Sequence, residues 1–293
     1  MGADFTLLID HPNKNFAKKA ASKAFKEAHR LDQIFSDYIS DSELSRLSIN
    51  SGSSGFYPLS EDLFQVLAAS QKLAIETKGA FDITIGPFSR LWRIARFRKT
   101  LPNSNVLLNA HKRVGHEKLI LDYEKKEAQL LENAMVLDLG GIAKGYAADQ
   151  MLKTLKRFGV SRVLIDAGGD ILLGDAPSDK SGWRIEIGGR KHPDLPILIV
   201  SNIAIATSGD FEQSVTLNDQ KFSHLINPFT GIGLTNLSQV TVLAPSAMVA
   251  DSLASACLVL GSNKGMKYLQ SKQQIQAFFL EKKESGTELF RSN

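Results

Sequence analysis

Asp251 and Ser255 are four residues apart in a segment whose apolar residues recur with helical spacing. At about 100° per residue, this spacing places the carboxylate and the hydroxyl on one stripe of a helix, away from its apolar row. Hard cations such as Mg²⁺ prefer oxygen ligands of this kind. The stripe therefore has two interpretations, as part of a cation site or as an ordinary solvated helix face.

A second candidate is the segment VLDLGGIAKGYAAD, residues 136–149, in which an expected strand runs into Gly140 and Gly141 and then into a helix. Backbone N–H groups at such a turn can approach an anion, and the helix dipole favours a phosphate there. Lys144 adds a positive charge on the first helical turn. The glycine spacing matches no phosphate-loop or dinucleotide signature, so an ordinary tight turn explains the segment equally well.

His224 precedes Asn-Pro and Thr-Gly in a turn signal over residues 223–231. Near a phosphate and a hydroxyl, the ordinary pKa of histidine would suit it to act as a general base, although a lone histidine is usually structural. Residues 168–170 and 206–210 are further tight turns or polar clamps. The sequence contains no G-x-S-x-G elbow, which argues against a serine hydrolase.

The elements that must position these residues are helices and short strands without regular alternation or repeats, which predicts an α+β fold. No linker divides the chain, so we expect one domain over residues 1–293. Residues 80–87 are expected to form a strand or loop, and residues 101–114 show no clear pattern. Helices are predicted from residue 16 to about residue 38, after Ser60, from residue 143 to 158 and from Ser246 to Gly261. Short strands are expected at 5–9, 119–121, 128–131, 135–139, 162–165, 171–173, 183–187, 197–200, 203–206 and 239–243.

Composition narrows the function classes. The 293 residues carry a net charge of +4 with the basic residues scattered, which argues against nucleic acid as a partner. The densest basic stretch, residues 90–99, could form an amphipathic membrane or RNA surface, but a solvated helix or loop face is favoured. The single Cys257 excludes an intramolecular disulfide. No apolar run approaches the roughly 18 residues of a membrane-spanning helix.

Taken together, eight segments in order resemble the motifs of the FAD:protein FMN transferase (ApbE) family, over nearly the whole chain. They are MGADFTLLI, SDYISDSELSRLS, GAFDITIGPFSRLW, DLGGIAKGYAAD, DAGGDILLGD, ATSGDFE, HLINPFTGIG and QVTVLAPSAMVADSLASACLVLG. The resemblance implies an α+β enzyme that binds FAD and Mg²⁺. Such an enzyme moves FMN from FAD to a Thr or Ser hydroxyl of a target protein and releases AMP.

The resemblance also implies site residues. Met1, Tyr38, Ala80, Phe81 and Asp82 would line the flavin. Asp138 and Lys144 would hold other parts of FAD, and Ile226 would pack against it. Mg²⁺ would take Asp251, Ser255 and the backbone carbonyl of Gly141 as ligands, which joins the first two candidates into one site. His224 would deprotonate the acceptor hydroxyl.

Two positions depart from the family pattern, since Ser255 replaces the common Thr and Asn227 replaces a frequent Asp. Family members usually carry an export signal or a lipid-attachment cysteine, and this sequence begins at the Met-Gly strand. Both a periplasmic or inner-membrane-attached location, with the signal missing from this chain, and a cytoplasmic one are compatible with it. Expected acceptors are subunits of a Na⁺-pumping NADH dehydrogenase or a related electron-transport complex. An FAD pyrophosphatase and a non-catalytic flavin carrier are the alternative functions.

Overall fold

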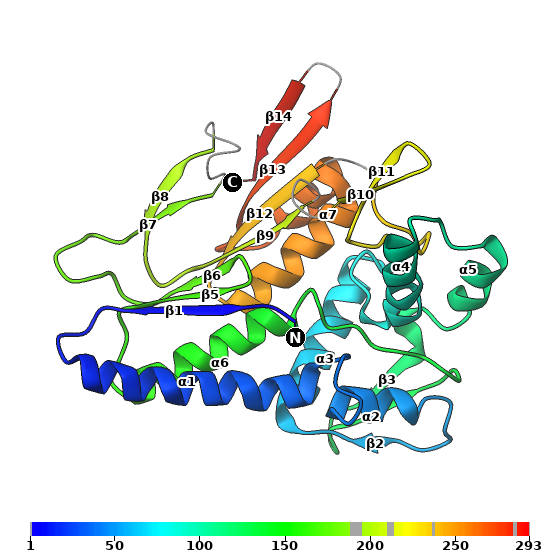
Figure 1. The fold of residues 1–293 in the computed structure, drawn as a ribbon, viewed down its shortest axis with the longest axis horizontal. Helices are drawn as coiled ribbons and strands as arrows, with labels where there is room; N and C mark the ends of the chain where they lie inside the picture. Colours follow the sequence, from blue (N-terminus) through cyan, green and yellow to red (C-terminus); the bar gives the residue numbers. More distant parts are fainter. Residues whose placement is uncertain (1, 188–194, 210–213, 236–237, 284–285, 293) are drawn as a thin grey trace.

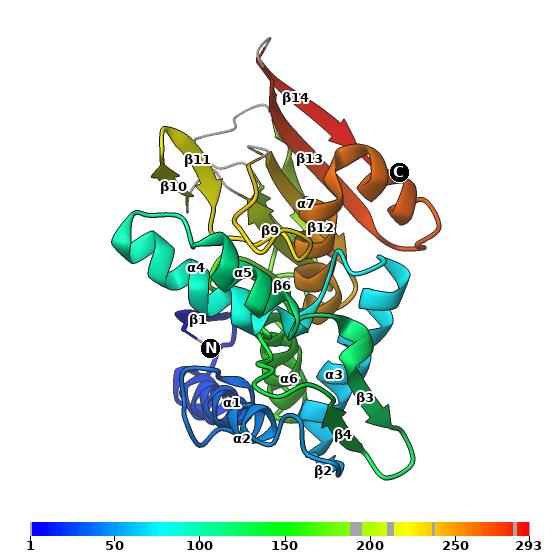
Figure 2. The ribbon, with the colours of Figure 1, turned by 90° about the vertical axis from the view of Figure 1, so that its right-hand side faces the viewer.

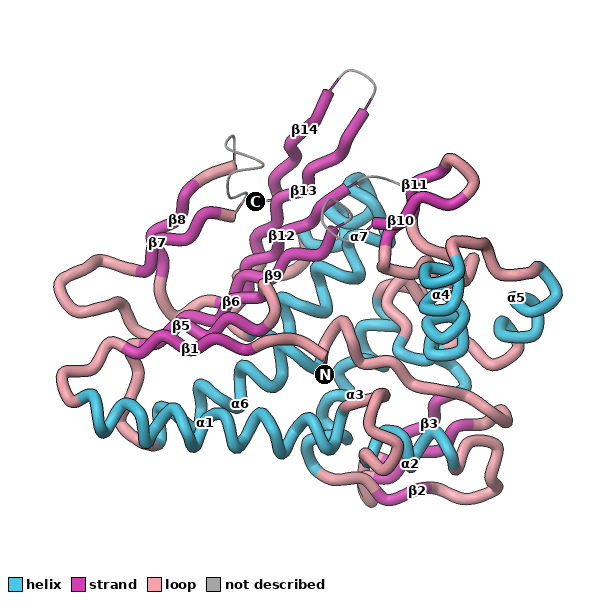
Figure 3. Tube along the Cα trace, in the orientation of Figure 1, coloured by secondary structure: helices cyan, strands magenta, loops and turns pink. Residues whose placement is uncertain are grey.

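A seven-stranded antiparallel sheet forms the centre of the molecule in a computed structural model that describes residues 2–187, 195–209, 214–235, 238–283 and 286–292 (Figures 1 and 3). In spatial order, its strands are β1 (Phe5–Ile9), β5 (Val163–Ala167), β6 (Asp170–Leu173), β9 (Ala204–Gly209), β12 (Ser238–Ala244), β13 (Gln276–Lys283) and β14 (Gly286–Arg291). Alternating burial along β5 shows why these short apolar segments form strands with a helix-covered face.

Three long helices cover that face: α1 (Lys14–Phe35), α6 (Ala143–Arg157) and α7 (Ala247–Leu269) (Figure 1). Helix α6 packs against both α1 and α7. The buried stripe of α1 begins with small residues at four-residue spacing, Ala20, Ala24 and Ala28, and ends with Leu31 and Phe35. The small residues let the two helix backbones approach closely. Helix α6 is thereby held beside α7 and the strands β5 and β6.

A second group of elements lies beside this layer. It comprises α2 (Glu43–Ile49), α3 (Glu61–Glu76), the 3₁₀ turn η1 (Ile83–Ile85), α4 (Gly86–Arg98), α5 (Ser104–His111), the 3₁₀ turn η2 (His116–Lys118) and a small sheet of β2 (Tyr57–Pro58), β4 (Glu127–Leu130) and β3 (Leu119–Asp122). Two hairpins, β7 (Trp183–Glu186) with β8 (Ile197–Val200) and β10 (Ser214–Leu217) with β11 (Gln220–Ser223), complete the described fold. The β3–β4 hairpin and the β13–β14 hairpin lie at opposite ends of the molecule (Figure 2).

The structure confirms the predicted α+β class and the helices capped by Ser60 and Ser246, whose side chains accept hydrogen bonds from Leu63 N and Val249 N. Helix α7 is kinked at Gly261, which has a φ of 75°, and then continues to Leu269. The first predicted helix ends early, at Phe35, with Ser36 as its C-cap.

Two local predictions, for residues 80–87 and 135–139, are wrong, and a helix forms in a segment for which the sequence shows no clear pattern. Residues 80–87 contain η1 and the start of α4, because the Asp82 side chain caps the turn and Pro87 suits the first turn of a helix. Residues 104–111 form α5, whose only buried residue is Ala110, so its apolar stripe is weak. Residues 135–139 are apolar and buried but form no strand, since their backbone bonds instead to Ile83 and Gly86. Within the described residues, no helix is long and apolar enough to cross a bilayer.

Candidate active site

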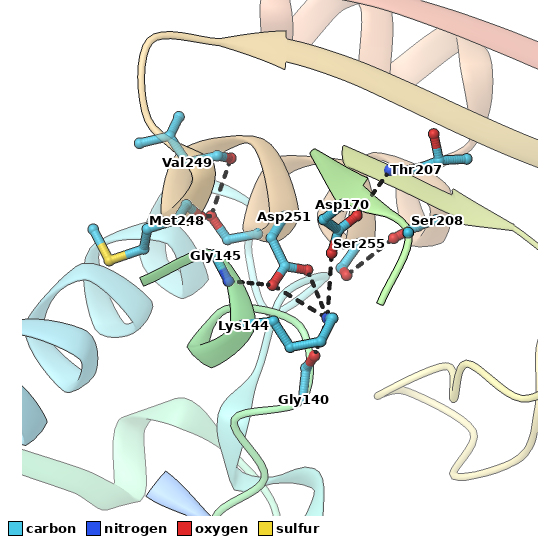
Figure 4. A network of polar contacts seen from close by, with 12 residues as sticks. Gly140, Lys144, Gly145, Asp170, Thr207, Ser208, Met248, Val249, Asp251 and Ser255 are labelled. Carbon is cyan, nitrogen blue, oxygen red and sulfur yellow. Dashed lines mark hydrogen bonds and ion pairs between the residues drawn. The ribbon is translucent and has the colours of Figure 1, made fainter. Parts of the chain in front are cut away.

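Lys144 lies at the centre of a polar cluster at the junction of α6, α7 and β6 (Figure 4). Its Nζ is 3.3 Å from both carboxylate oxygens of Asp251 on α7 and 3.4 Å from Oδ2 of Asp170, the first residue of β6. It also donates to the carbonyl oxygen of Gly140 at 2.9 Å. Four oxygens from three parts of the chain therefore surround one ammonium group.

Close packing between α6 and α7 places these groups together. A Cβ atom on Gly145 would overlap the backbone of Ala247, so only glycine lets the two helices meet here. The Gly145 N–H donates to Asp251 Oδ2 at 3.2 Å. On the next turn of α6, the Asp149 carboxylate accepts from Ser246 Oγ and from two backbone N–H groups at the start of α7. Asp149 thus caps the N-terminus of α7 and fixes the position of Asp251 along α7 relative to Lys144 on α6.

The electrostatics of the cluster follow from burial. Asp251 and Asp170 are 3% and 7% exposed, so two carboxylates share one ammonium in a region that excludes water. Burial, followed by repulsion from Asp251, raises the pKa of Asp170 to about 7, although Lys144 and the Thr207 N–H act in the opposite direction. Burial opposes charge on Lys144 as well, but the two carboxylates raise its pKa above the ordinary value. When both carboxylates are ionised, the cluster carries a net negative charge and favours an additional cation.

A hard cation fits the donors that lie on this side of α7. The backbone of Gly141 runs against Ser255, because a Cβ atom on Gly141 would lie 2.8 Å from Ser255 Oγ. Ser255 Oγ is in turn 3.3 Å from Ser208 Oγ on β9. Together with Asp251, this set consists of oxygens alone, the chemistry that Mg²⁺ prefers. Among the described residues, no group of three or more His, Cys, Asp or Glu side chains is placed to hold a metal ion, so a cation here would depend on hydroxyl and backbone oxygens as well as on Asp251.

A pocket of about 330 Å³ opens beside the cluster and brings most of the predicted site residues together. Its lining includes Tyr38, Ala80, Phe81, Asp82, Asp138, Gly141, His224, Ile226 and Ser255. Lys144 and Asp251 do not line it. Lys144 donates to the carbonyl oxygen of Gly140, which does line it, and Ser255, another lining residue, follows Asp251 by one turn of α7. Met1 lies outside the described residues, as do residues 210–212 of the ATSGDFE segment.

The pocket wall is held by local hydrogen bonds. Asp82 Oδ1 accepts from the backbone N and the hydroxyl of Thr84 at 2.8 and 2.7 Å, and burial raises the pKa of Asp82 despite these bonds. Asp138 accepts from the Gly140 N–H at 2.9 Å, which shapes the turn before α6. His224 is half-buried and comes from a distant part of the sequence, the segment directly after β11. It lines the same pocket.

Two contributors to this site, Asp170 and Arg93, were not among the predicted site residues, although residues 168–170 were a candidate polar clamp. In the sequence, Asp170 follows two glycines and looks like part of a turn. In the structure it is the first residue of β6, and the register of β6 with β5 determines that its side chain is buried. Arg93 of α4 binds Asp37 at 2.7 Å and stacks on the Tyr38 ring, 4.4 Å from its centroid. Arg93 belongs to the basic stretch 90–99, for which the sequence favours a solvent-exposed helix or loop face. No sequence pattern predicts that it binds Asp37.

The chain is similar in sequence to proteins named FAD:protein FMN transferase. The chain is 30% identical to the FAD:protein FMN transferase of Haemophilus influenzae over 86% of its length and 75% of that protein. It is 29% identical to the FAD:protein FMN transferase of Vibrio cholerae over 100% of its length and 89% of that protein.

Solved structures show the same fold. The flavin transferase ApbE from Vibrio cholerae superimposes with a TM-score of 0.87 at 29% identity, covering 100% of this chain and 94% of that one. The apo form of the Pseudomonas stutzeri flavinyl transferase ApbE superimposes with a TM-score of 0.83 at 26% identity, covering 98% and 90%. The sequence pattern described for the ApbE family matches residues 1–279. The chain therefore belongs to the ApbE family.

Proposed function

We propose that this protein transfers FMN from FAD to a Thr or Ser hydroxyl of an acceptor protein, with Mg²⁺ bound and with release of AMP. The observation that carries the proposal is the position of the oxygen donors and Lys144 directly beside a pocket that also contains His224. With Mg²⁺ bound beside Lys144, this arrangement would provide positive charge for a pyrophosphate and, at the same pocket, a base for a hydroxyl. The names of the relatives support the substrate and the reaction class.

Each group has a distinct role in the proposed reaction. Pocket residues Tyr38, Phe81 and Ile226 bind the flavin half of FAD, and Asp138 and Lys144 hold its other parts. A ring nitrogen of His224 accepts the proton of the acceptor hydroxyl. The hydroxyl oxygen then forms a bond to the phosphorus of the FMN half, and the bond from that phosphorus to the bridging oxygen breaks. The bridging oxygen leaves with AMP.

Asp251, Ser255 and the carbonyl of Gly141 would hold Mg²⁺. When bound, Mg²⁺ neutralises charge that develops on the phosphate oxygens during transfer. With Asp251 engaged by the metal, Asp170 keeps Lys144 in place, since both carboxylates already contact its Nζ. Positioning of FAD and acceptor in one pocket supplies the remaining rate enhancement.

A pair of serine variants on α7 tests the proposal. Ser255→Ala removes a proposed ligand, whereas Ser252→Ala removes a hydroxyl that bonds only within the helix, to Met248 and Val249. Wild-type protein is incubated with FAD, Mg²⁺ and a flavin-accepting subunit of a Na⁺-pumping NADH dehydrogenase. AMP, free FMN and acceptor-bound flavin are then followed over time.

We expect acceptor-bound flavin and AMP to form at equal rates. Ser255→Ala should slow transfer at least about tenfold and raise the Mg²⁺ concentration required, because one of three protein ligands is lost. Ser252→Ala should resemble wild type. Free FMN and AMP without labelled acceptor would instead indicate a pyrophosphatase, and FAD that stays intact would indicate a flavin carrier.

A further inference from the structure

A second pocket, of about 640 Å³, adjoins the candidate active site and shares only Tyr38 with its lining. We call it the arginine pocket. It forms where α2, α4, the segment after α5 and residues 133–137 meet. Its lining includes Ser45, Ser48, Ile49, Arg90, Arg113 and Asn133. The function proposed above assigns no role to any of these residues.

The arginine pocket contains cationic groups without protein partners. Among the described residues, neither Arg90 nor Arg113 forms an ion pair, and the buried Nε of Arg113 has no hydrogen-bond partner. Asp37 also lines this pocket, but its carboxylate is bound by Arg93 at 2.7 Å. A buried N–H without a hydrogen-bond partner is destabilising. These donors are therefore suited to an anionic ligand that is supplied from outside the chain.

The lining favours a polypeptide over a nucleotide. Among the described residues, Tyr38 is the only aromatic one that lines the pocket, and the Arg93 guanidinium already covers one face of its ring. A base would therefore find little surface for stacking. The pocket wall instead offers serine and asparagine side chains, and Ile49, which is 75% exposed, provides an apolar contact. A polar groove with an exposed apolar residue and unpaired arginines matches an acidic segment of a protein.

We propose that the arginine pocket binds an acidic segment of the acceptor polypeptide, whose carboxylates face Arg90 and Arg113. Because the pocket shares Tyr38 with the active site, a segment held there is continuous with a hydroxyl that enters beside His224. The proposal rests on the transferase function proposed above and adds the chemistry by which the acceptor is selected.

The test uses the double variant Arg90→Gln with Arg113→Gln. The matched control is Arg98→Gln, which removes an exposed arginine at the end of α4 that lines neither pocket. Transfer to a flavin-accepting subunit of a Na⁺-pumping NADH dehydrogenase is measured at low and high ionic strength. The affinity for FAD is measured separately by flavin fluorescence.

At low salt, we expect the double variant to raise the KM for the acceptor at least about tenfold, with kcat within about twofold and FAD affinity unchanged. High salt should raise the wild-type KM toward that of the double variant, because charge attraction is screened. Arg98→Gln should behave as wild type.

Two results would overturn the docking proposal alone. One is an unchanged acceptor KM in the double variant, and the other is weakened FAD binding, which would assign the arginine pocket to the nucleotide. If the wild-type protein cleaves FAD without labelling the acceptor, the proposed transferase function fails first, and the docking proposal fails with it.

Discussion

At the scale of single residues, the Lys144 side chain contacts the turn before α6, helix α7 and strand β6, and so connects the elements that form the site. Its ammonium holds two buried carboxylates, Asp251 and Asp170, that would otherwise repel each other. The same ammonium lies beside Gly140 at the turn that leads into α6. One side chain thus links the turn, the helix and the strand on which the proposed chemistry depends.

Removal of the positive charge of Lys144 should destabilise the folded protein. Lys144→Met should lower the free energy of unfolding by about 3–5 kcal/mol in metal-free protein at neutral pH, because it leaves buried carboxylates without a cation. Lys153→Met, which changes an exposed lysine of the same helix, should change it by less than about 0.5 kcal/mol. Urea unfolding measures both effects.

Mg²⁺ provides the control for this prediction. If the cation binds Asp251, millimolar Mg²⁺ should restore part of the stability lost in Lys144→Met, since it replaces the missing positive charge. A Lys144→Met protein as stable as wild type would show that Lys144 does not neutralise the carboxylates. A lost stability that Mg²⁺ leaves unchanged would argue against a metal at Asp251.

The raised pKa of Asp170 predicts that the stability of the folded protein depends on pH. Its pKa of about 7 in the folded state lies above the ordinary value of 3.8, so the folded protein binds a proton that the unfolded chain releases between about pH 4 and 7. The stability contributed by this proton is complete below pH 4 and is lost as the pH rises toward 7. In EDTA, wild-type stability should therefore fall relative to Asp170→Asn by up to about 1.4 kcal/mol per pH unit in this window.

This comparison reports on Asp170 together with its partners Lys144 and Asp251, because the titrating groups away from this cluster are shared by the two proteins. Denaturant unfolding at several pH values between 4 and 8 provides the measurement. Parallel stability curves for wild type and Asp170→Asn would mean that Asp170 titrates near its ordinary pKa when folded, and that the carboxylate pair is not strongly coupled.

At the scale of elements, the site depends on the joint between α6 and α7. Asp149 accepts from the Ala247 and Met248 N–H groups at 2.9 and 3.0 Å, which otherwise remain unpaired at a partly buried helix end. Asp149→Ala should therefore destabilise the protein by about 2–3 kcal/mol. The exposed Asp41→Ala serves as the control and should have little effect.

The same variant tests whether the joint positions the site. Asp149 touches none of the proposed ligands, so its loss should reduce Mg²⁺ affinity only through displacement of Asp251. We expect weaker Mg²⁺ binding in Asp149→Ala, measured by calorimetry below the unfolding temperature. Destabilisation with unchanged Mg²⁺ affinity would show that the cap is structural and does not align the helices for binding.

The accuracy of sequence-based prediction also differs between elements. Helices with a clear cap and apolar stripe, such as α3 and α7, follow from Ser60 and Ser246. The segment 135–139 has strand composition, but its pairing with η1 and α4 is set by tertiary contacts that no local pattern records. The hairpins of β10–β11 and β13–β14 were likewise not predicted.

At the scale of the whole molecule, motifs distant in sequence converge on one pocket. Helical spacing placed Asp251 and Ser255 on one stripe, and the structure shows that this stripe faces the polar cluster and not the solvent. Two residues could not be found from spacing. Asp170 approaches Lys144 only through the order of strands in the sheet, and Arg93 meets Asp37 across a separation of 56 residues.

The central claim is that an acceptor hydroxyl, and not water, receives the FMN phosphorus. Mass spectrometry of the products formed in ¹⁸O-labelled water with FAD, Mg²⁺ and the acceptor subunit tests it most directly. We predict an acceptor that gains one FMN, together with AMP, and no ¹⁸O in either product, because the new bond uses the acceptor oxygen. Free FMN that contains one ¹⁸O, with an unmodified acceptor, would contradict the claim.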